Sequence, residues 1–258
     1  MKLSVIIPGI RPQNWLNLYD SIKKSFSEDF EAIFVGPHYF VKLGDKTIGN
    51  VPGTKFIKSY RSPCAAQQQG LMKATGDYIT WAADDGIFLP HALDEAMNMI
   101  NFATSEDEGE FVVVGRYLEG DSPIGMHSQD YYRFRYHKPY RLAGINPDWL
   151  IFNCGLISRK LILELGGWDC QFETTTCAHA DLGIRVQKSG ARMLLMDDVM
   201  FKCSHQPGKT GDHAPVHRAM VKRDLPRFQE MYRKPNERIK IELDNWKVTP
   251  EIWSERFK

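Results

Sequence analysis

Apolar and polar positions follow two alternating periodicities along the first hundred residues. Short apolar runs indicate buried strands, and the segments between them carry apolar residues every three to four positions, which indicates amphipathic helices. The predicted strands are 3–8, 31–35, 54–58, 78–83 and 111–114, and the predicted helices are 14–26, 65–74 and 90–102. This alternation predicts an α/β fold with a mostly parallel, doubly wound sheet flanked by helices.

The alternation of strand and helix patterns becomes less regular after residue 115. Helices are predicted at 159–165 and 181–189, each stopped by glycine, and a last strand at 200–204 follows an acidic corner, Asp197-Asp198. The remaining chain is amphipathic and helical in places. We therefore expect one domain over residues 1–214 and a C-terminal helical extension over 215–258 that packs on it.

Composition narrows the functional classes. The 258 residues are 43% hydrophobic, which allows a sizeable core, and the formal net charge of +1 gives no support for a nucleic-acid partner. No apolar run approaches the ~20 residues of a membrane span. The five cysteines are dispersed without a CxxC pair, which indicates reduced thiols in a cytoplasmic protein. A zinc site of cysteines 170, 177 and 203 with histidines 179 and 205 is disfavoured because this spacing fits no common pattern.

Two adjacent carboxylates, Asp84 and Asp85, stand directly after the predicted strand 78–83, and Gly86 follows them. In open α/β sheets ligands bind beyond the carboxyl ends of strands. Adjacent carboxylates repel each other unless a cation, water or hydrogen-bond donors hold them. We therefore expect Mn²⁺ or Mg²⁺ at this pair, bridging to a diphosphate. The alternative is a solvated Asp-Gly turn.

Five short motifs occur in an order that carries a family resemblance. They are SVIIPGIRP (4–12), AQQQGLMKATGDYITW (66–81), AADDGIFLP (82–90), GGWD (166–169) and AHADLGIR (178–185), followed by His205. Together they resemble the family 2 glycosyltransferases, which have the GT-A fold. The resemblance covers roughly residues 3–206. It implies a metal-dependent, inverting, hexosyltransferase-like enzyme that moves a sugar from a nucleotide-sugar donor, a UDP-sugar by default.

The resemblance also implies site residues. It places the metal on Asp85, with Asp84 and His205 completing the site. The residues expected to bind the nucleotide-sugar donor are Pro8, Gly9, Arg11, Gly36, Arg61, Gln67, Gln68, Asp84 and Asn153. The chain departs from the family where the second strand ends in Gly36-Pro37 without a base-binding aspartate, and where Gln67 and Gln68 replace Arg and Asn.

The sequence allows three alternatives for the general base. The Glu-Asp pair of the family aligns with Ala178-His179, so His179 occupies the position of the base, and an imidazole with an ordinary pKa of ~6.5 is partly neutral at pH 7. Asp181 is the competing base. In a third alternative Asp181 only caps a helix that begins at Leu182, and there is no conventional base.

The segment 130–141, DYYRFRYHKPYR, is dense in aromatic and basic residues, which suit sugar faces and anionic groups. The residues expected to bind the acceptor are Tyr132, Arg135, Trp149, Trp168 and Asp169. The alternative for this segment is an ordinary amphipathic surface loop. The resemblance implies a saccharide or lipid-linked acceptor, and it leaves open a peripheral contact with the inner face of a membrane. The sequence gives no indication of oligomeric state.

Two other functions compete with a transferase. A catalytically inactive nucleotide- or sugar-binding protein is favoured by the Ala178-His179 replacement. A nucleotidyltransferase on a similar sheet would need a glycine-rich phosphate loop near the N-terminus, and residues 8–12, PGIRP, are too poor in glycine to favour it.

Overall fold

The computed structural model describes residues 3–38, 42–43, 46–119, 152–203, 211–232, 238–253 and 257. Its centre is an eight-stranded sheet with the strand order β5-β2-β1-β6-β9-β8-β10-β7. The strands are β1 (Leu3–Pro8), β2 (Phe30–Gly36), β5 (Thr54–Lys58), β6 (Tyr78–Trp81), β7 (Gly86–Phe88), β8 (Phe111–Glu119), β9 (Gly155–Ser158) and β10 (Arg192–Cys203). Two short strands, β3 (Lys42–Leu43) and β4 (Lys46–Thr47), form a separate antiparallel pair.

Parallel pairing predominates in the large sheet. β1 pairs in parallel with β2 and β6, β2 pairs in parallel with β5, and β8 pairs in parallel with β10. β9 is antiparallel to both of its neighbours, and β7 is antiparallel to β10 at the edge. The predicted mostly parallel sheet is therefore confirmed, with the two antiparallel strands β9 and β7 as the part that the pattern did not predict.

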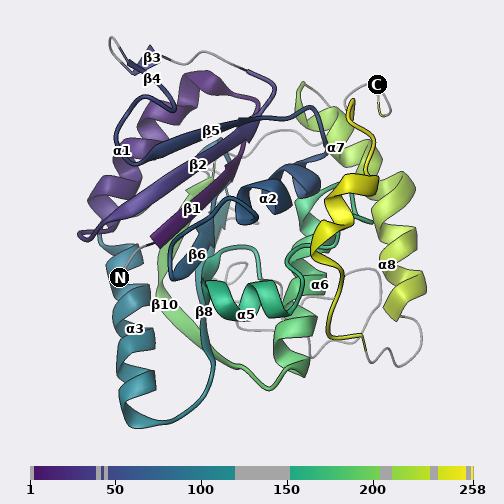
Figure 1. Ribbon diagram of the computed structural model, residues 1–258. Helices are drawn as coiled ribbons and strands as arrows, with labels where there is room; N and C mark the ends of the chain where they lie inside the picture. Colours follow the sequence, from purple (N-terminus) through teal and green to yellow (C-terminus); the bar gives the residue numbers. More distant parts are fainter. Residues whose placement is uncertain are drawn as a thin grey trace.

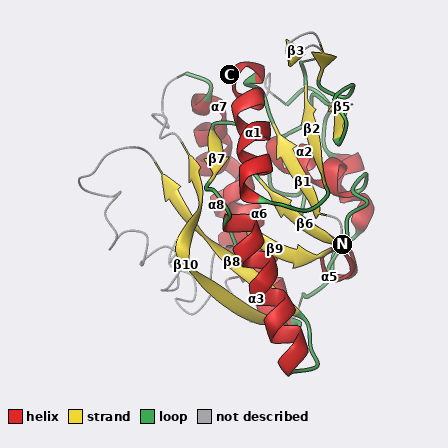
Figure 2. Cartoon of the chain, turned by 90° about the vertical axis from the view of Figure 1, so that its left-hand side faces the viewer, coloured by secondary structure: helices red, strands yellow, loops and turns green. Residues whose placement is uncertain are grey.

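Helices cover both faces of the sheet, because successive residues of the buried strands point to opposite faces. Leu3, Val5 and Ile7 of β1 pack with α1 (Trp15–Ser25) and α3 (Ala92–Glu106). Ile6 packs on the other face with α2 (Pro63–Leu71), α5 (Arg159–Glu164), α6 (Thr175–Lys188) and α8 (Leu225–Tyr232). Figure 1 shows the two groups of helices on either side of the sheet, and Figure 2 shows α1 and α3 lying in front of the strands. The fold is thus doubly wound.

Several element boundaries differ from the sequence prediction, most clearly those of β10, α6 and α3. β10 is one strand of 12 residues instead of a corner followed by a short strand, because register shifts between Leu195 and Val199 accommodate the acidic pair. α6 begins at Thr175, six residues earlier than predicted, so Asp181 lies in the helix interior and the prediction that it caps a helix is wrong. α3 continues to Glu106, four residues beyond its predicted end at residue 102.

The C-terminal part packs against the main sheet domain. It consists of α7 (His213–Ala219), the π-helical turn η3 (Met220–Asp224), α8 and the 3-10 helix η4 (Leu243–Val248). Phe228 and Tyr232 are buried in the same core cluster as α2 and α6. The boundary expected between residues 214 and 215 lies inside α7. Among the described residues, no helix has the length and apolar character needed to cross a bilayer.

Candidate functional site at the carboxyl edge of the sheet

Asp84 holds together the turn that follows β1. Its Oδ2 accepts hydrogen bonds from the backbone N–H groups of Ile10, at 2.7 Å, and Arg11, at 2.5 Å. Its Oδ1 lies 2.6 Å from Arg11 Nη1, and its backbone carbonyl accepts from Asn14 Nδ2. The side chain of Asp84 is therefore occupied by the protein itself, and its carboxylate serves as an anchor for the turn.

The ends of β1 and β2 and the segment after β6 lie close together here, and two glycines make this possible. A Cβ on Gly36 would lie 1.9 Å from the carbonyl oxygen of Gly9, and a Cβ on Gly9 would lie 2.9 Å from Asp84 Oδ2. Gly9 N–H donates to the carbonyl of Val35, which ties the end of β1 to the end of β2. Pro8, Gly9 and Gly36, expected to bind the donor, lie together here, and the requirement for glycine at these positions comes from backbone packing.

Asp85 occupies a different environment from its neighbour. Its Oδ2 lies 3.3 Å from His213 Nε2 and 3.6 Å from Arg11 Nη1, and the Cys203 thiol donates to its Oδ1 at 3.2 Å. Burial raises the pKa of Asp85, but the hydrogen bond from His213 and the positive charge of Arg11 more than offset this, so its pKa lies below the ordinary value. Asp85 is therefore ionised at neutral pH, and its partners are side chains rather than the backbone.

Arg11 is the cation between these carboxylates. Besides Asp84 and Asp85 it contacts Asp212, whose Oδ2 lies 2.7 Å from Arg11 Nε. Arg11 thus joins the turn after β1, the end of β6 and the residue before α7. Three carboxylates from two distant parts of the chain, Asp84-Asp85 and Asp212, converge on one guanidinium. A second cation or an anionic phosphate can bind at such a place through exchange of partners.

The fit of a divalent cation depends on Asp85 and His213. A carboxylate and an imidazole are suitable ligands for Mn²⁺, and they stand next to each other here. Within the described residues, no three histidine, cysteine or acidic side chains are arranged to hold a metal ion by themselves. The donor set therefore fits a metal whose remaining ligands come from a diphosphate and water, provided that Arg11 releases Asp85.

His179 lies in an aromatic cluster beneath this edge. Its ring is 5.6 Å from that of Trp81 and 6.5 Å from that of Trp168, and its Nε2 is 3.1 Å from Gln67 Oε1. In this orientation of the amide, Nε2–H is the donor and Nδ1 is left as the basic nitrogen. Burial lowers the pKa of His179 to about 3, so the imidazole is neutral at physiological pH. Gln67 Nε2 and Trp168 Nε1 are buried and find no acceptor among the described residues.

Asp181 is enclosed in an ion-pair network. Its Oδ2 lies 2.8 Å from the guanidinium of Arg185, and its Oδ1 accepts from Arg238 Nη2, at 2.6 Å, and from the hydroxyl of Tyr232. Burial raises the pKa of Asp181, but the two arginine charges outweigh it, so its pKa lies below the ordinary value. Both oxygens are engaged and the side chain is fully buried, which makes Asp181 a poor proton acceptor as it stands.

Several residues expected to bind donor or acceptor have structural partners instead. Gln68 donates to the carbonyls of Gly166 and Leu243 and accepts from Trp168 N–H, so its amide bridges three segments of the chain. Arg61 donates to the carbonyls of Trp246 and Thr249 and lies over the Trp246 ring. These contacts correct the expectation that the polar groups of Gln68 and Arg61 face a nucleotide, because both residues tie down the C-terminal segment.

The GGWD segment is also built into the interior. Trp168 is fully buried, and Asp169 is 1% exposed with its Oδ2 2.6 Å from Arg238 Nη1. Neither presents a surface to an acceptor in this arrangement, contrary to expectation. Asn153 lies next to the cluster around His179, since its carbonyl accepts from Trp81 Nε1 at 2.7 Å.

Four of the expected site residues, Tyr132, Arg135, Trp149 and His205, lie outside the described residues. The structure in turn identifies three residues that sequence reasoning missed: Asp212 and His213 at the carboxylate site, and Arg238 between Asp169 and Asp181. One weak feature of the sequence could have indicated His213 as a site residue: like His205, it is a late histidine in a polar stretch, eight positions further along the chain. Nothing in the local pattern marked Asp212 or Arg238.

Known proteins resemble this chain in structure but not detectably in sequence. No protein-family profile matches it, and no curated protein sequence matches it. Residues 1–349 of TarS from S. aureus superimpose with a TM-score of 0.55 at 14% identity, covering 90% of this chain and 69% of that one. The same TarS fragment has been solved with UDP and with UDP-GlcNAc.

A second solved neighbour is the mannosyltransferase PcManGT from Pyrobaculum calidifontis, in complex with GDP-Man and Mn²⁺. It superimposes with a TM-score of 0.57 at 15% identity, covering 91% of this chain and 65% of that one. The chain spans only 40% of a longer TarS structure. At these identities the likeness concerns the fold alone. The chain shares the α/β fold of TarS and PcManGT, which supports the GT-A-like fold expected from the sequence.

Proposed function

We propose that this protein is a glycosyltransferase that transfers a sugar from a nucleotide-sugar donor to an acceptor hydroxyl, with inversion at the sugar C1. The observation that carries the proposal is the position of Asp85. It is an ionised, buried carboxylate at the carboxyl edge of the sheet, between His213 and Arg11. Ligands bind at this edge in open α/β sheets, and the neighbours with this fold were solved with nucleotide-sugars or nucleotides.

The reaction first requires that the leaving diphosphate be stabilised. Negative charge gathers on its oxygens as the bond to the sugar breaks, and fixed positive groups at that position lower the barrier. Arg11 and His213 are the cationic or hydrogen-bond-donating groups beside Asp85. In the proposed reaction Arg11 turns from the carboxylates to the diphosphate, where its guanidinium offers two parallel hydrogen bonds.

A divalent cation is the second part of the donor site in this proposal. Asp85 and His213 would hold Mn²⁺ or Mg²⁺ together with oxygens of the diphosphate. When bound, the metal supplies Lewis-acid stabilisation of the leaving group. Asp84 takes no direct part, because its carboxylate holds the turn that carries Arg11.

The acceptor hydroxyl sets the second demand, because it must lose its proton during attack. Between the two candidate bases we retain His179, since both oxygens of Asp181 are committed to arginine and tyrosine partners. A neutral imidazole with a pKa of about 3 is a weak base. We therefore assign His179 the role of accepting a hydrogen bond from the hydroxyl at Nδ1 and orienting it.

The donor class and acceptor follow from the neighbours and the resemblance. A UDP-sugar is the default donor, with a GDP-sugar as the second choice, because the solved neighbours carry UDP, UDP-GlcNAc or GDP-Man. The acceptor is a saccharide or a lipid-linked saccharide hydroxyl.

The test is release of nucleoside diphosphate from a panel of UDP- and GDP-sugars, with Mn²⁺ or with chelator. The proposal predicts slow, Mn²⁺-dependent hydrolysis of one donor and its loss in Asp85→Asn. Lys23→Gln, an exposed substitution far from the site, serves as the control. Absence of hydrolysis and transfer for every donor would reject an active transferase.

A catalytically inactive sugar- or nucleotide-binding protein is the second candidate. The observation in its favour is that neither His179 nor Asp181 is an ordinary base here, since burial keeps the first neutral and ion pairs enclose the second. Binding of one nucleotide-sugar without any turnover, in the presence of Mn²⁺, would favour this candidate over the transferase.

A further inference from the structure

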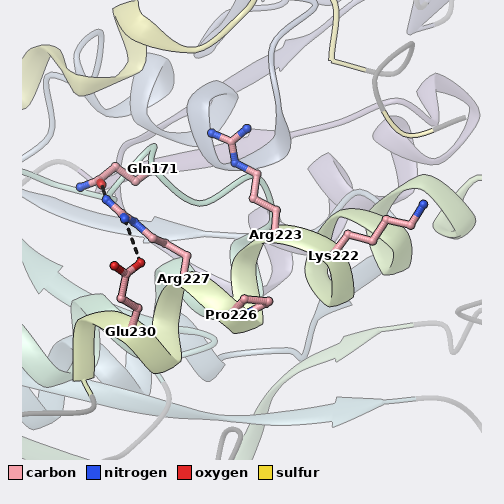
Figure 3. A pocket seen from close by; sticks show the side chains of 6 residues that line it. All are labelled: Gln171, Lys222, Arg223, Pro226, Arg227 and Glu230. Carbon is pink, nitrogen blue, oxygen red and sulfur yellow. Dashed lines mark hydrogen bonds and ion pairs between the residues drawn. The ribbon is translucent and has the colours of Figure 1, made fainter.

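A basic groove lies away from the carboxylate site, on the C-terminal helices. Its volume is about 410 Å³, and the residues that line it are Gln171, Lys222, Arg223, Pro226, Arg227 and Glu230. In Figure 3, Arg227 extends from α8 toward Gln171 and Glu230, Arg223 extends from the π-helical turn η3, and Lys222 extends from the same turn away from the other labelled side chains. The lining thus holds three cationic side chains and one carboxylate, in a chain whose total charge is only +1.

The groove rests on a rigid support. Asp224, fully buried in η3, accepts hydrogen bonds from Glu173 N–H, at 2.9 Å, from Thr174 N–H, at 2.8 Å, and from the Thr174 hydroxyl, at 2.6 Å. Asp224 therefore fastens the π-helical turn to the residues that precede α6. π-helical turns are rare and are frequently found at functional sites. Here the wider turn directs Asp224 inward while Lys222 and Arg223 face solvent.

Within the described part of the chain, the two arginines of the groove pair with side chains of other residues. Arg223 Nη1 lies 3.2 Å from Glu173 Oε1 and Arg227 Nη1 lies 3.2 Å from Glu230 Oε2, with the arginine side chains 49% and 42% exposed. Arg227 also donates to the side-chain oxygen of Gln171. Glu173 is only 1% exposed, so its pair with Arg223 is partly buried, whereas the exposed pair of Arg227 with Glu230 contributes about 0–1 kcal/mol. An anion that accepts two parallel hydrogen bonds from a guanidinium can replace such a partner at small cost.

We propose that this groove binds phosphate groups, either of a soluble phosphorylated ligand or of phospholipid headgroups. A phosphate offers several acceptor oxygens and a full negative charge, which matches two forked guanidiniums with an ammonium at the rim. The groove is separate from the Asp85 site and does not depend on the proposed transferase activity. The segment 171–174 contacts both Asp224 and Arg227, and it leads directly into α6.

The test compares two variants that lose the same charge. The triple variant Lys222→Gln, Arg223→Gln, Arg227→Gln removes the cations of the groove. The matched control Lys23→Gln, Lys160→Gln, Arg192→Gln removes three exposed cations that also face carboxylates. Circular dichroism and thermal unfolding verify that both variants fold. Neither variant alters the Asp85 site, so pyrophosphate bound there contributes equally to all three proteins.

Two binding assays distinguish the sources of phosphate. One measures flotation with vesicles of phosphatidylcholine alone or with 30% phosphatidic acid, a composition chosen on the order of the anionic content of cell membranes. The other measures pyrophosphate binding by calorimetry. The proposal predicts that the parent protein and the control bind at least one probe and that the groove variant binds it about tenfold or more weakly. Loss in the vesicle assay alone identifies lipid headgroups, and loss with pyrophosphate identifies a soluble ligand. No binding by the parent protein, or equal binding by the groove and control variants, overturns the proposal.

Discussion

Asp84 contacts Arg11 at two points, the backbone N–H and the side-chain guanidinium of the arginine. The Arg11 N–H donates to Asp84 Oδ2 at 2.5 Å, and Arg11 Nη1 lies 2.6 Å from Asp84 Oδ1. One carboxylate thereby fixes both the path of the turn after β1 and the direction of the side chain that faces Asp85. The two adjacent aspartates differ in their partners, since Asp84 holds the turn after β1 and Asp85 pairs with the side chains of His213 and Arg11. In the proposed function Asp85 is the one that binds a ligand.

This division predicts losses of stability of different size for two neighbouring substitutions. Asp84→Asn removes the charge from hydrogen bonds with two backbone N–H groups and a guanidinium, so it should lower the free energy of unfolding by about 2–4 kcal/mol. Asp85→Asn has only side-chain partners to lose and should cost about 1 kcal/mol or less. Urea unfolding of the two variants measures both values. Equal losses, or a larger loss for Asp85→Asn, would contradict the assignment of Asp84 as the anchor.

Removal of Arg11 should strengthen metal binding. The guanidinium stands 3.6 Å from Asp85 Oδ2 and repels a second cation. Arg11→Ala is expected to tighten Mn²⁺ binding by about tenfold, as measured by the electron paramagnetic resonance signal of free Mn²⁺. Lys23→Ala, which removes a charge elsewhere, should leave the affinity unchanged. Weaker Mn²⁺ binding in Arg11→Ala would show that Arg11 supports the metal instead of competing with it.

His179 should make the protein sensitive to acid. Its pKa is about 3 in the folded state and ordinarily ~6.5, so the unfolded chain binds the proton more readily. The contribution of neutral His179 to stability is therefore complete above pH 6.5 and is lost as the pH falls from 6.5 toward 3, by on the order of a few kcal/mol. His179→Gln should flatten the decline of unfolding free energy between pH 7 and pH 5. An unchanged slope in this variant would mean that the imidazole is solvated.

Arg238 is expected to secure the C-terminal segment. It bridges Asp169 and Asp181, two buried carboxylates, and its loss leaves Asp169 without its arginine partner. Arg238→Gln should therefore reduce the free energy of unfolding by about 2–4 kcal/mol, because an uncompensated buried charge is costly. Arg192→Gln breaks an exposed pair with Asp107 and should cost less than about 1 kcal/mol. Similar small losses in both variants would indicate that water replaces Arg238.

The sequence predicted the framework of the fold well. The apolar runs of β1 and β2 and the helical spacing of α1 are signals of burial, and these elements form as expected. β9 escaped prediction because its four residues, Gly155–Ser158, are too short for a periodicity. The start of α6 was missed because the polar residues Thr174–Thr176 give no apolar signal, and Asp224, 50 positions away, holds the backbone N–H of Thr174.

The candidate site was predictable only in part. The strand followed by two carboxylates marked its location, but the difference between Asp84 and Asp85 depends on which oxygens the turn after β1 reaches. Gln68 and Arg61 were expected to bind the donor because of the family resemblance. Their partners, the carbonyls of Leu243 and Trp246, are more than 170 residues away in the chain. Such long-range contacts leave no trace in local spacing.

Thermal unfolding with a panel of nucleoside diphosphates, each with and without Mn²⁺, tests most directly the claim that Asp85 forms a metal-assisted nucleotide site. A ligand at ~100 times its dissociation constant stabilises a fold by about 2.7 kcal/mol. We predict a Mn²⁺-dependent rise in Tm with one nucleotide, its loss in Asp85→Asn and its retention in the exposed control Asp20→Asn. The same rise in Asp85→Asn, or no rise with any nucleotide in the parent protein, would contradict the claim.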